Sequence, residues 1–434
     1  MTVKVALLGC GNVGSQVARI LLEQSDELAA RVGAPLELTG IAVRDPEAPR
    51  EGDLPRDLLT TDAHTLIDGA DIVIELMGGL EPAGEYIERA LRRGASVVTG
   101  NKALLAARLP ELTEAANDGG AQLLYEAAVA GAIPILRPIR ESLAGDDITK
   151  VMGIVNGTTN YILDAMDSSG AQFDEALADA QRLGYAEADP TADVEGHDAA
   201  AKAALLASLA FHTTFALENV HCEGITSISA EDVAAAEDAG MVIKLLAIAE
   251  RGTDAGGGEG ISVRVHPTLL PREHPLAAVR GAFNAVFVEA ENAGELMFYG
   301  QGAGGAPTAS AVMGDVVSVG RTRATQAAGA SVAEPQPRPS RPLGIEDATT
   351  SYALSLDVSD ETGVLAEIAG IVARHGVSIE TMRQTASAED GAGSARLRII
   401  THVGREAALA ATVADIEQLP VVKAVSSVVR VEGK

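Results

Sequence analysis

The first third of the chain alternates short apolar runs with amphipathic segments. The apolar runs predict buried strands at residues 3–8, 36–43, 71–76, 95–99 and 122–125. Helical patterns follow the first, third and fourth of these runs. Short apolar strands that alternate with helices are typical of a parallel sheet with helices on both faces. We therefore expect an α/β domain over residues 1–133.

The pattern changes after residue 134. Strand-like runs and helical patterns now alternate less regularly, at residues 150–155, 173–183, 198–211, 261–265 and 285–289. This mixture predicts an α+β domain with a mixed sheet covered by helices, over residues 134–300. Residues 301–328 are glycine-rich and then helical.

The last part of the chain shows a third pattern. Residues 329–343 are Pro-rich and lack apolar periodicity, which indicates a linker, taken as residues 329–347. Residues 348–434 then read as strand, helix, strand, strand, helix, strand, at 352–358, 362–375, 377–384, 395–402, 406–419 and 421–431. The order βαββαβ predicts a ferredoxin-like domain.

Composition and charge narrow the functional classes. The 434 residues carry 61 Asp and Glu against 33 Lys and Arg, a net charge of −28, with an isoelectric point near 4.6. Such a chain is not expected to bind nucleic acid through a basic face, nor anionic membranes. No apolar run reaches the length of a membrane span. Cys10 and Cys222 are the only cysteines, which suits a cytoplasmic protein without a disulfide framework.

A glycine pattern between the first strand and the first helix predicts dinucleotide binding. Gly9 permits a tight turn, Gly11 lets the backbone approach a pyrophosphate, and Gly14 allows close packing of helix on strand. Asn12 and Val13 then begin the helix, whose free N–H groups face the phosphates. This context favours a Rossmann nucleotide-binding domain over a turn without a ligand.

The end of the second strand bears on the choice of coenzyme. Arg44 and Asp45 stand there side by side. An acidic residue binds the ribose 2′-hydroxyl of NAD, whereas an Arg accommodates the 2′-phosphate of NADP. We favour NADP(H), with Arg44 as a surface residue as the alternative.

Lys102 follows the fourth strand, at the edge of the sheet where such domains bind ligands. A cation at a helix N-terminus has the wrong sign for the helix dipole, which favours a function for Lys102 over plain solvent exposure. Residues 156–160, NGTTN, also lie between a strand and a helix. They fit an anion-binding turn or an ordinary helix cap equally well.

The segment over residues 184–202 concentrates acidic residues before a lysine. Asp198 and Lys202 are four residues apart and share one helix face. An exposed pair of this kind is worth only ~0.3–0.5 kcal/mol. The helix is apolar almost all round, however, so it should be buried, and a buried lysine needs a partner. Buried ionisable pairs are candidates for function.

Together these motifs resemble homoserine dehydrogenases. The resemblance extends from about residue 3 to 325, through GCGNVG, TGNKALLA, YEAAVAGAIPI, GIVNGTTNYIL, LGYAEADPTADVEGHDAAAK and GQGAGGAPTASAV. The segment DETGVLAEIAGIVARHGVSIETM resembles an ACT domain, a small amino-acid-sensing module. The chain thus resembles the monofunctional form with a C-terminal regulatory domain.

The resemblance implies the NAD(P)H-dependent, reversible reduction of L-aspartate 4-semialdehyde to L-homoserine, in threonine, methionine and isoleucine biosynthesis. It implies that Lys202 donates the proton, that Lys102 binds substrate and cofactor, and that Gly302 contacts the cofactor. The segment over residues 301–328 should return to pack on the nucleotide domain. The implied substrate-binding residues are Glu187, Asp193, Asp198, Lys202, Gly157, Thr158 and Tyr185.

The resemblance also implies a monovalent cation, usually sodium, held through the backbone carbonyls of Glu126, Val129, Gly131 and Ile133. In the ACT domain it places an effector, with threonine expected, at Asp360, Gly363 and Val364. A homodimer or tetramer is expected.

Two other functions stay open on the residues alone. An acylating semialdehyde dehydrogenase would need a cysteine nucleophile with a nearby histidine, and neither cysteine has a convincing context. A nucleotide-binding sensor without catalysis would leave the Asp198 and Lys202 pair unexplained.

Overall fold

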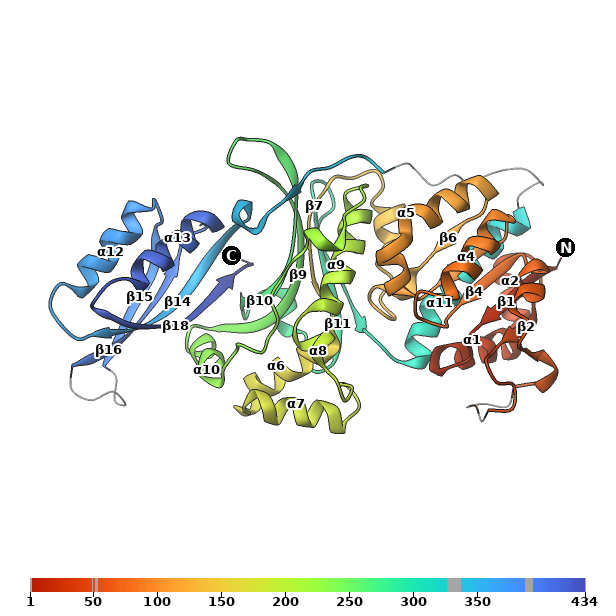
Figure 1. The fold of residues 1–434 in the computed structure, drawn as a ribbon, viewed down its shortest axis with the longest axis horizontal. Helices are drawn as coiled ribbons and strands as arrows, with labels where there is room; N and C mark the ends of the chain where they lie inside the picture. The colour runs from red at the N-terminus through yellow and green to blue at the C-terminus, as the bar shows by residue number, and fades with distance from the viewer. Residues whose placement is uncertain (1, 49, 51–53, 326–336, 387–392, 434) are drawn as a thin grey trace. The chain divides into compact units, whose positions relative to one another are not determined.

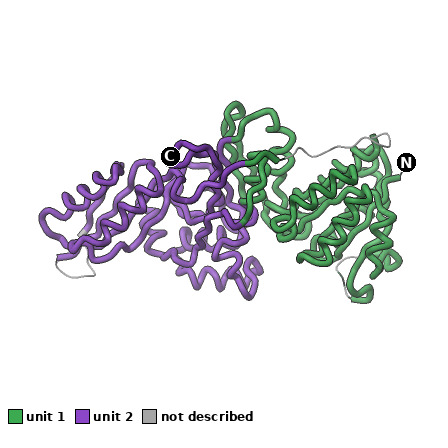
Figure 2. The backbone as a smooth tube through the Cα atoms, turned by 45° about the horizontal axis from the view of Figure 1, so that its top comes forward, with its two compact units in different colours: residues 1–148, 204–217, 283–339 green, residues 149–203, 218–282, 340–434 purple. Residues whose placement is uncertain are grey.

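The computed structural model describes residues 2–48, 50, 54–325, 337–386 and 393–433. The chain divides into two compact units, each built from separate stretches of sequence (Figure 2). Unit 1 contains residues 1–148, 204–217 and 283–339, and unit 2 contains residues 149–203, 218–282 and 340–434.

Unit 1 is built on a parallel sheet with the strand order β3-β2-β1-β4-β5-β6; Figure 1 labels β1, β2, β4 and β6 of this sheet. The strands are β1 (Val3–Leu8), β2 (Leu36–Ala42), β3 (Leu59–Thr60), β4 (Ile72–Glu75), β5 (Ser96–Thr99) and β6 (Leu123–Leu124). The order reverses between β1 and β4, and such a switch point opens a crevice at the carboxyl ends of the strands. The glycine-rich turn follows β1 at this edge.

In the described part of unit 1, the helices that cover this sheet are α1 (Asn12–Glu23), α2 (Ser25–Val32), α3 (Ala63–Asp68), α4 (Ala83–Arg92), α5 (Lys102–Gly119) and α11 (Gly305–Thr325). Helices α1, α2 and α11 pack together, and α3, α4 and α5 form a second layer. Helix α11 thus returns from late in the sequence to the core beside β1, where Val312, Val316 and Val319 are fully buried. Helix α5 is kinked at Arg108, two residues before Pro110.

The remainder of unit 1 consists of short elements and a hairpin. The short elements are η1 (Arg56–Leu58), η2 (Glu126–Ala128) and the π-helical turn η3 (Pro138–Ser142). Strands β11 (Phe283–Ala290) and β12 (Gly294–Gln301) form an antiparallel hairpin. Asp146 holds its turn by accepting hydrogen bonds from the backbone N–H groups of Asn292 and Ala293.

Unit 2 contains a mixed sheet in the order β7-β9-β10-β18-β14-β16-β15. The strands are β7 (Ile148–Ile154), β9 (Met241–Thr253), β10 (Glu259–Pro271), β18 (Val422–Val431), β14 (Thr349–Ser359), β16 (Ser394–Thr401) and β15 (Ile379–Ala386). Strands β10 and β18 pair in parallel, and the other neighbours pair antiparallel. The sheet therefore continues from the middle of the chain into the C-terminal βαββαβ domain (Figure 1).

The helices of this part of the chain are α6 (Gly157–Ser169), α7 (Phe173–Arg182), α8 (Thr191–Val194), α9 (His197–Ala210), α10 (Ala230–Asp238), α12 (Val364–Arg374) and α13 (Glu406–Glu417). Short elements complete it: η4 (Leu217–Asn219), β8 (His221–Cys222), η5 (Pro275–Ala278), β13 (Pro342–Leu343), η6 (Ile345–Asp347) and β17 (Gly404–Arg405). Helices α12 and α13 cover one face of the C-terminal sheet and share its apolar core.

Most elements coincide with the apolar pattern of the sequence. Strand β1 has the predicted bounds, and the predicted buried helix is α9, in which Lys202 is only 8% exposed. Strands β9 and β12 were not predicted as such. Of the predicted linker, residues 329–336 lie outside the described residues, whereas β13 pairs with β10. Within the described residues, no helix combines the length and the hydropathy that crossing a bilayer requires.

Candidate active site

The glycine-rich turn has the geometry that dinucleotide binding requires. Gly9 has a φ of 97°, and a Cβ added there would lie 2.7 Å from the carbonyl oxygen of Leu76. A Cβ on Gly14 would lie 2.3 Å from the carbonyl oxygen of Gly9. A Cβ on Gly11 would meet nothing within 4 Å, because Gly11 is the open N-cap of α1. The turn therefore forms a cradle that fits a pyrophosphate against the exposed first turn of α1.

Alanine substitutions at two of these glycines are expected to separate packing from binding. Gly14→Ala forces a backbone overlap, so the melting temperature of the ligand-free protein should fall. Gly11→Ala should leave stability within about 0.5 kcal/mol of wild type. It should still raise the Kd for NADPH at least tenfold, about 1.4 kcal/mol, because its methyl group occupies the phosphate cradle. Thermal unfolding and NADPH fluorescence titration measure the two effects, and unchanged NADPH binding in both variants would contradict the assignment.

The segment that leads into α11 is packed against the start of α1, strand β11 and the segment around Gly131. A Cβ on Gly305 would lie 2.8 Å from the carbonyl oxygen of Asn12, and a Cβ on Gly302 would lie 2.1 Å from Asn284 Nδ2. A Cβ on Gly131 would lie 2.3 Å from the carbonyl oxygen of Gly302. The return segment therefore joins the glycine-rich turn to the segment that carries the predicted cation ligands.

A buried carboxylate organises the carboxyl edge of β4 and β5. Glu75 is fully buried; its Oε1 accepts hydrogen bonds from two backbone N–H groups in the following loop, and its Oε2 accepts one of 2.6 Å from Thr99 Oγ1. Asn101 caps α5, and its Nδ2 donates to the carbonyl oxygen of Gly79 at 2.7 Å. Lys102 is the first residue of α5, and its side chain is exposed. Sequence reasoning missed Glu75, although an acid that ends an apolar strand was a signal.

The loop after β2, which the sequence predicts to select the coenzyme, contains Arg44 and Arg50. Arg44 lies just beyond β2 and is exposed, as is Asp45. Arg50 donates hydrogen bonds to the carbonyl oxygens of Pro46 and Ala48. Burial raises the pKa of the Cys10 thiol, and the charge of Arg50 acts in the opposite direction. Arg50 thus belongs to the loop after β2, and its charge acts on the thiol in the glycine-rich turn.

Unit 2 brings a lysine, two carboxylates and an asparagine together. Lys202 Nζ lies 2.7 Å from Asp198 Oδ2 and donates a hydrogen bond of 2.6 Å to the carbonyl oxygen of Val155. Asn156 Nδ2 donates to Asp198 Oδ2 at 3.0 Å and to Asp193 Oδ1 at 2.6 Å. The side chains of Lys202 and Asp198 are about 10% exposed. The cluster holds an ammonium group and carboxylates at fixed positions, an arrangement suited to a polar, zwitterionic substrate.

The start of α6 supplies the rest of this cluster. Asn156 caps the helix, because its Oδ1 accepts a hydrogen bond of 2.9 Å from the backbone N–H of Thr159. Thr158 Oγ1 donates to the carbonyl oxygen of Tyr185 at 2.7 Å. NGTTN is thus a helix cap, one of the two alternatives that the sequence left open, and its asparagine amide also contacts two carboxylates, which the sequence did not predict.

Two other predicted substrate residues, Gly157 and Glu187, contribute no side-chain hydrogen bond to the cluster in the described structure. Gly157 packs so tightly that an added Cβ would lie 2.7 Å from the carbonyl oxygen of Ala282. Glu187 is exposed, and its carbonyl oxygen accepts a hydrogen bond from Gln181. In the part of the chain that the structure describes, no hydrogen bond links the Glu187 carboxylate to the cluster of Lys202.

The segment with the predicted cation ligands winds around the side chain of Glu126. The two Glu126 carboxylate oxygens accept hydrogen bonds from the backbone N–H groups of residues 135–137. The Glu126 N–H donates to Asp315 Oδ2 at 2.8 Å. Burial raises the pKa of Asp315 to about 6; the hydrogen bond from the Glu126 N–H opposes this rise, and the charge of the Glu126 carboxylate adds to it. Because the Glu126 carboxylate already accepts these hydrogen bonds, only the backbone carbonyl oxygen of Glu126 is left for the predicted cation. Among the described residues, no cluster of three or more His, Cys, Asp or Glu side chains has metal-binding geometry.

The predicted effector residues lie where β14 leads into α12. Asp360 and Gly363 are exposed, and Asp360 Oδ1 accepts a hydrogen bond of 3.2 Å from Gln384 Nε2. Gly363 has a φ of 102° and forms the N-cap of α12. The Val364 side chain is buried in the core of the C-terminal domain, so only its backbone faces this loop.

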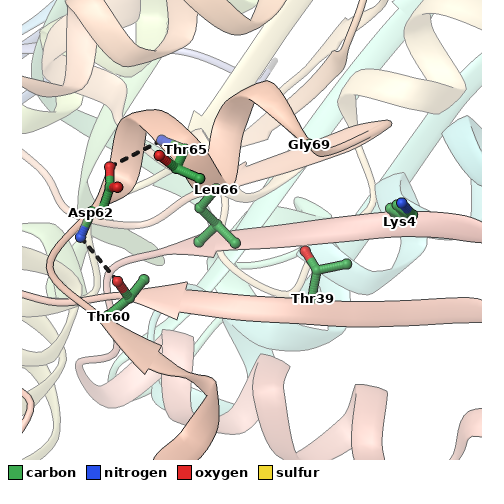
Figure 3. Close-up of a pocket in the computed structure, with 7 residues that line it drawn as sticks. All are labelled: Lys4, Thr39, Thr60, Asp62, Thr65, Leu66 and Gly69. Atoms are coloured by element: carbon green, nitrogen blue, oxygen red, sulfur yellow. Dashed lines mark hydrogen bonds between the residues drawn. The ribbon is translucent and has the colours of Figure 1, made fainter.

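One surface hollow lies away from these groups. It has a volume of about 310 Å³ and is lined by Lys4, Thr39, Thr60, Asp62, Thr65, Leu66 and Gly69 (Figure 3). Lys4 is at the start of β1, whereas the glycine-rich turn follows the end of that strand. None of the predicted site residues lines the hollow.

A parallel sheet with a glycine-rich turn, and a buried lysine held among carboxylates, define a dinucleotide-dependent oxidoreductase. Homoserine dehydrogenases of Corynebacterium glutamicum and Mycobacterium tuberculosis are 55% and 53% identical to the chain over 99% of its length, and the matches cover 96% and 98% of those proteins. The chain therefore belongs to the homoserine dehydrogenase family of oxidoreductases.

Family models and solved structures agree with this assignment and confirm the predicted fold class. The model for homoserine dehydrogenase matches residues 134–317, its NAD-binding domain matches residues 9–126, and an ACT domain matches residues 352–421. A crystal structure of a homoserine dehydrogenase from Thiobacillus denitrificans superposes with a TM-score of 0.90 at 40% identity, covering 100% of this chain and 98% of that one. A hyperthermophilic archaeal homoserine dehydrogenase mutant in complex with NADPH matches with a TM-score of 0.61 at 28% identity, over 74% of this chain and 98% of that one. The NAD-binding domain indicates that the chain uses NAD(P).

Proposed function

We propose that the chain catalyses the reversible reduction of L-aspartate 4-semialdehyde to L-homoserine, with NADPH as its preferred coenzyme and with threonine as a feedback effector. This activity belongs to threonine, methionine and isoleucine biosynthesis, and we place it in the cytoplasm. The observation that carries the proposal is the cluster of Lys202, Asp198, Asn156 and Asp193.

In the proposed reaction, Lys202 acts on the substrate directly, and other residues of the cluster hold Lys202 in position. NAD(P)H, when bound, would supply a hydride for the aldehyde carbon. Lys202 donates a proton to the substrate oxygen as negative charge develops there. Asp198 keeps Lys202 in its ammonium form through the contact of 2.7 Å, and the carbonyl oxygen of Val155 fixes its direction. Lys102 is assigned to binding substrate and cofactor.

The carboxylates recognise the amino-acid part of the substrate. Asp193 and Asp198 bind the substrate ammonium, with Glu187 contributing from its exposed loop, while Gly157, Thr158 and Tyr185 line the same site. Asn156 holds Asp193 and Asp198 in place, because its amide donates to both. A site built from fixed carboxylates should bind an analogue without the amino group much more weakly than the substrate.

Coenzyme and cation complete the site. We assign dinucleotide binding to residues of the glycine-rich turn and of the return segment: Gly9, Gly11, Asn12, Val13, Gly14 and Gly302. The preference for NADPH rests on Arg44, on Arg50 in the same loop after β2, and on the relative whose structure contains NADPH. Sodium is assigned to the carbonyl groups of Glu126, Val129, Gly131 and Ile133. An ion there would fix the segment that packs on Gly302.

We assign domains to residues 1–133 for the dinucleotide, 134–300 for substrate and dimerisation, 301–328 for the return segment, 329–347 for the linker and 348–434 for the ACT domain. Threonine would bind at Asp360, Gly363 and the backbone of Val364. The exposed loop with its helix N-terminus supports this assignment. A homodimer or tetramer follows from the resemblance.

The chemistry of the two thiols disfavours an acylating semialdehyde dehydrogenase. Burial raises the pKa of Cys10, and burial together with Glu223 and Glu195 raises the pKa of Cys222. An acylating nucleophile needs a stabilised thiolate, which is the opposite shift.

Steady-state oxidation of NADPH and then NADH with aspartate semialdehyde, each with and without threonine, tests the proposal. We expect turnover with both coenzymes, a higher kcat/KM for NADPH, and a smaller ratio in Arg44→Ala. Threonine should inhibit the wild type and not the full-length Asp360→Ala variant. Absence of turnover with either coenzyme would contradict the assigned reaction, and equal inhibition of both proteins would contradict the assigned effector site.

A further inference from the structure

A second buried lysine lies outside the cluster of Lys202. Lys244 is on β9 and is 0% exposed. Its Nζ donates hydrogen bonds to Asn160 Oδ1 at 3.0 Å and to the carbonyl oxygen of Val279 at 2.6 Å. A buried lysine costs free energy unless its donors are used, so a chain that needed only packing would place an apolar residue here.

Lys244 contacts two elements that are themselves tied together. Asn160, in the first turn of α6, donates from Nδ2 to the carbonyl oxygen of Gly281 at 2.8 Å. One turn later, Asp164 accepts hydrogen bonds from the Gly281 N–H at 2.7 Å and from Arg280 at 2.8 Å. The segment over residues 279–282 is thereby fixed along α6.

This segment also reaches the start of α6. The carbonyl oxygen of Ala282 lies so close to Gly157 that an added Cβ would be 2.7 Å away. The Asn160 N–H donates to the carbonyl oxygen of Asn156 at 3.2 Å. Asn156 is the residue that holds Asp193 and Asp198. A continuous chain of contacts therefore links Lys244 to the carboxylates of the proposed substrate site.

We propose that Lys244 is a positioning residue for the substrate site, because it fixes the first turn of α6 and the segment over residues 279–282 and thus sets Asn156, Gly157 and Thr158. This inference rests on the proposed function. It requires no contact between Lys244 and the substrate.

The charges around Lys244 are consistent with a fixed structural donor. Burial lowers the pKa of Lys244 to about 8, Asp164 and Asp167 on α6 act against this change, and Arg280 and Arg272 add to it. The ion pairs of these arginines with the two aspartates balance the charge around the lysine.

The experiment compares homoserine oxidation by the full-length wild type and Lys244→Met. We expect the KM for homoserine to rise at least tenfold, with a fall in kcat, and the KM for NADP⁺ to stay within twofold. Lys244→Arg, which keeps donors at this position, should recover part of the loss. A purely structural role would lower the amount of active protein and leave both KM values unchanged.

Arg272→Gln is the matched control. Arg272 pairs with Asp167 Oδ1 at 2.6 Å, farther along α6, so its loss weakens the same helix away from the first turn. We expect wild-type KM values in this control at comparable loss of thermal stability. If Lys244→Met does not fold, Asn160→Ala cuts the same link and should show the same rise in the KM for homoserine.

The outcomes are distinguishable. A wild-type KM for homoserine in Lys244→Met, or in Asn160→Ala, would overturn the positioning role. An equal rise of the KM for homoserine in Lys244→Met and in Arg272→Gln would also overturn the positioning role. A wild type that does not oxidise homoserine would instead contradict the proposed function.

Discussion

Lys202→Met should lower kcat for homoserine oxidation by about 10²–10⁴-fold, the usual contribution of a positioned general acid or base. The substitution keeps the apolar stem and removes the ammonium that Asp198 and the carbonyl oxygen of Val155 hold in place. NADPH binding should persist, because the glycine-rich turn belongs to another part of the chain. Stopped-flow and steady-state assays measure the chemical step, and fluorescence titration measures coenzyme binding.

Lys150→Met serves as a control for Lys202→Met. Lys150 is also largely buried and paired with carboxylates, but with a different set: Glu432 at 2.7 Å and Glu250 at 3.7 Å. Its loss should reduce stability and leave kcat within a few-fold of wild type. A Lys202→Met protein that retains wild-type kcat would remove Lys202 from the mechanism.

Local patterns explain why much of this site could be predicted from the sequence. The turn after β1 has no room for a Cβ at Gly9 or Gly14, and α9 is apolar almost all round apart from Asp198 and Lys202. Both signals lie within a short stretch of chain, where the periodicity of one element decides which residues share a face.

The features of the site that could not be predicted from the sequence depend on contacts between residues far apart in the chain. Asn156 meets Asp198 across 42 positions, Glu126 meets Asp315 across 189, and Lys244 meets Asn160 across 84. No local period encodes such pairs. Strand β9 was missed for a related reason, because its run MVIKLLAIAERGT has no clear alternation and becomes a strand through pairing with β10.

The same kind of distant pairing joins the ACT domain to the middle of the chain. Strands β18 and β10 pair at Arg430 opposite Thr268 and Val431 opposite Leu269. Beside this pairing, Arg430 contacts Glu406 and Glu223 at 2.6 and 2.8 Å. Burial alone would raise the pKa of Glu223, yet hydrogen bonds from His221 and Arg430 hold it at about 2. Removing the ACT domain would expose these groups, so point substitutions test regulation better than truncation does.

Four alternating charges form a ring next to this pairing, the junction of β10 and β18: Arg264, Glu250, Lys150 and Glu432. Arg264 is fully buried, and it pairs with Glu250 at 2.7 Å and with Glu432 at 2.8 Å. Lys150 lies between the same two carboxylates. Burial alone would raise the pKa of Glu432, but Lys150 and Arg264 reverse the shift and lower it. The last residues of the chain thus neutralise charges that belong to β7 and β10.

Glu432→Ala should therefore lower the free energy of unfolding by about 3–5 kcal/mol, the range for breaking a buried ion pair from one side. Denaturation in urea measures the loss. Glu417→Ala is the matched control, since Glu417 is exposed at the end of α13 and should cost within about 0.5 kcal/mol. The double variant Arg264→Leu with Glu432→Leu should recover much of the loss, because it removes the stranded charge. Equal stability of Glu432→Ala and Glu417→Ala would show that the ring does not hold the junction.

The pH dependence of that difference has a defined sign. The folded state lowers the pKa of Glu432, so its contribution is fully present above the unfolded value, about 4.3, and is lost as the pH falls through the folded value. The gap in unfolding free energy between wild type and Glu432→Ala should be constant from pH 6 to 8, about the range where Glu432 stays ionised in both states. It should narrow below about pH 4. A gap that instead widened on acidification would mean that Glu432 is held in its neutral form, and the ring of charges would not be the source of the stability.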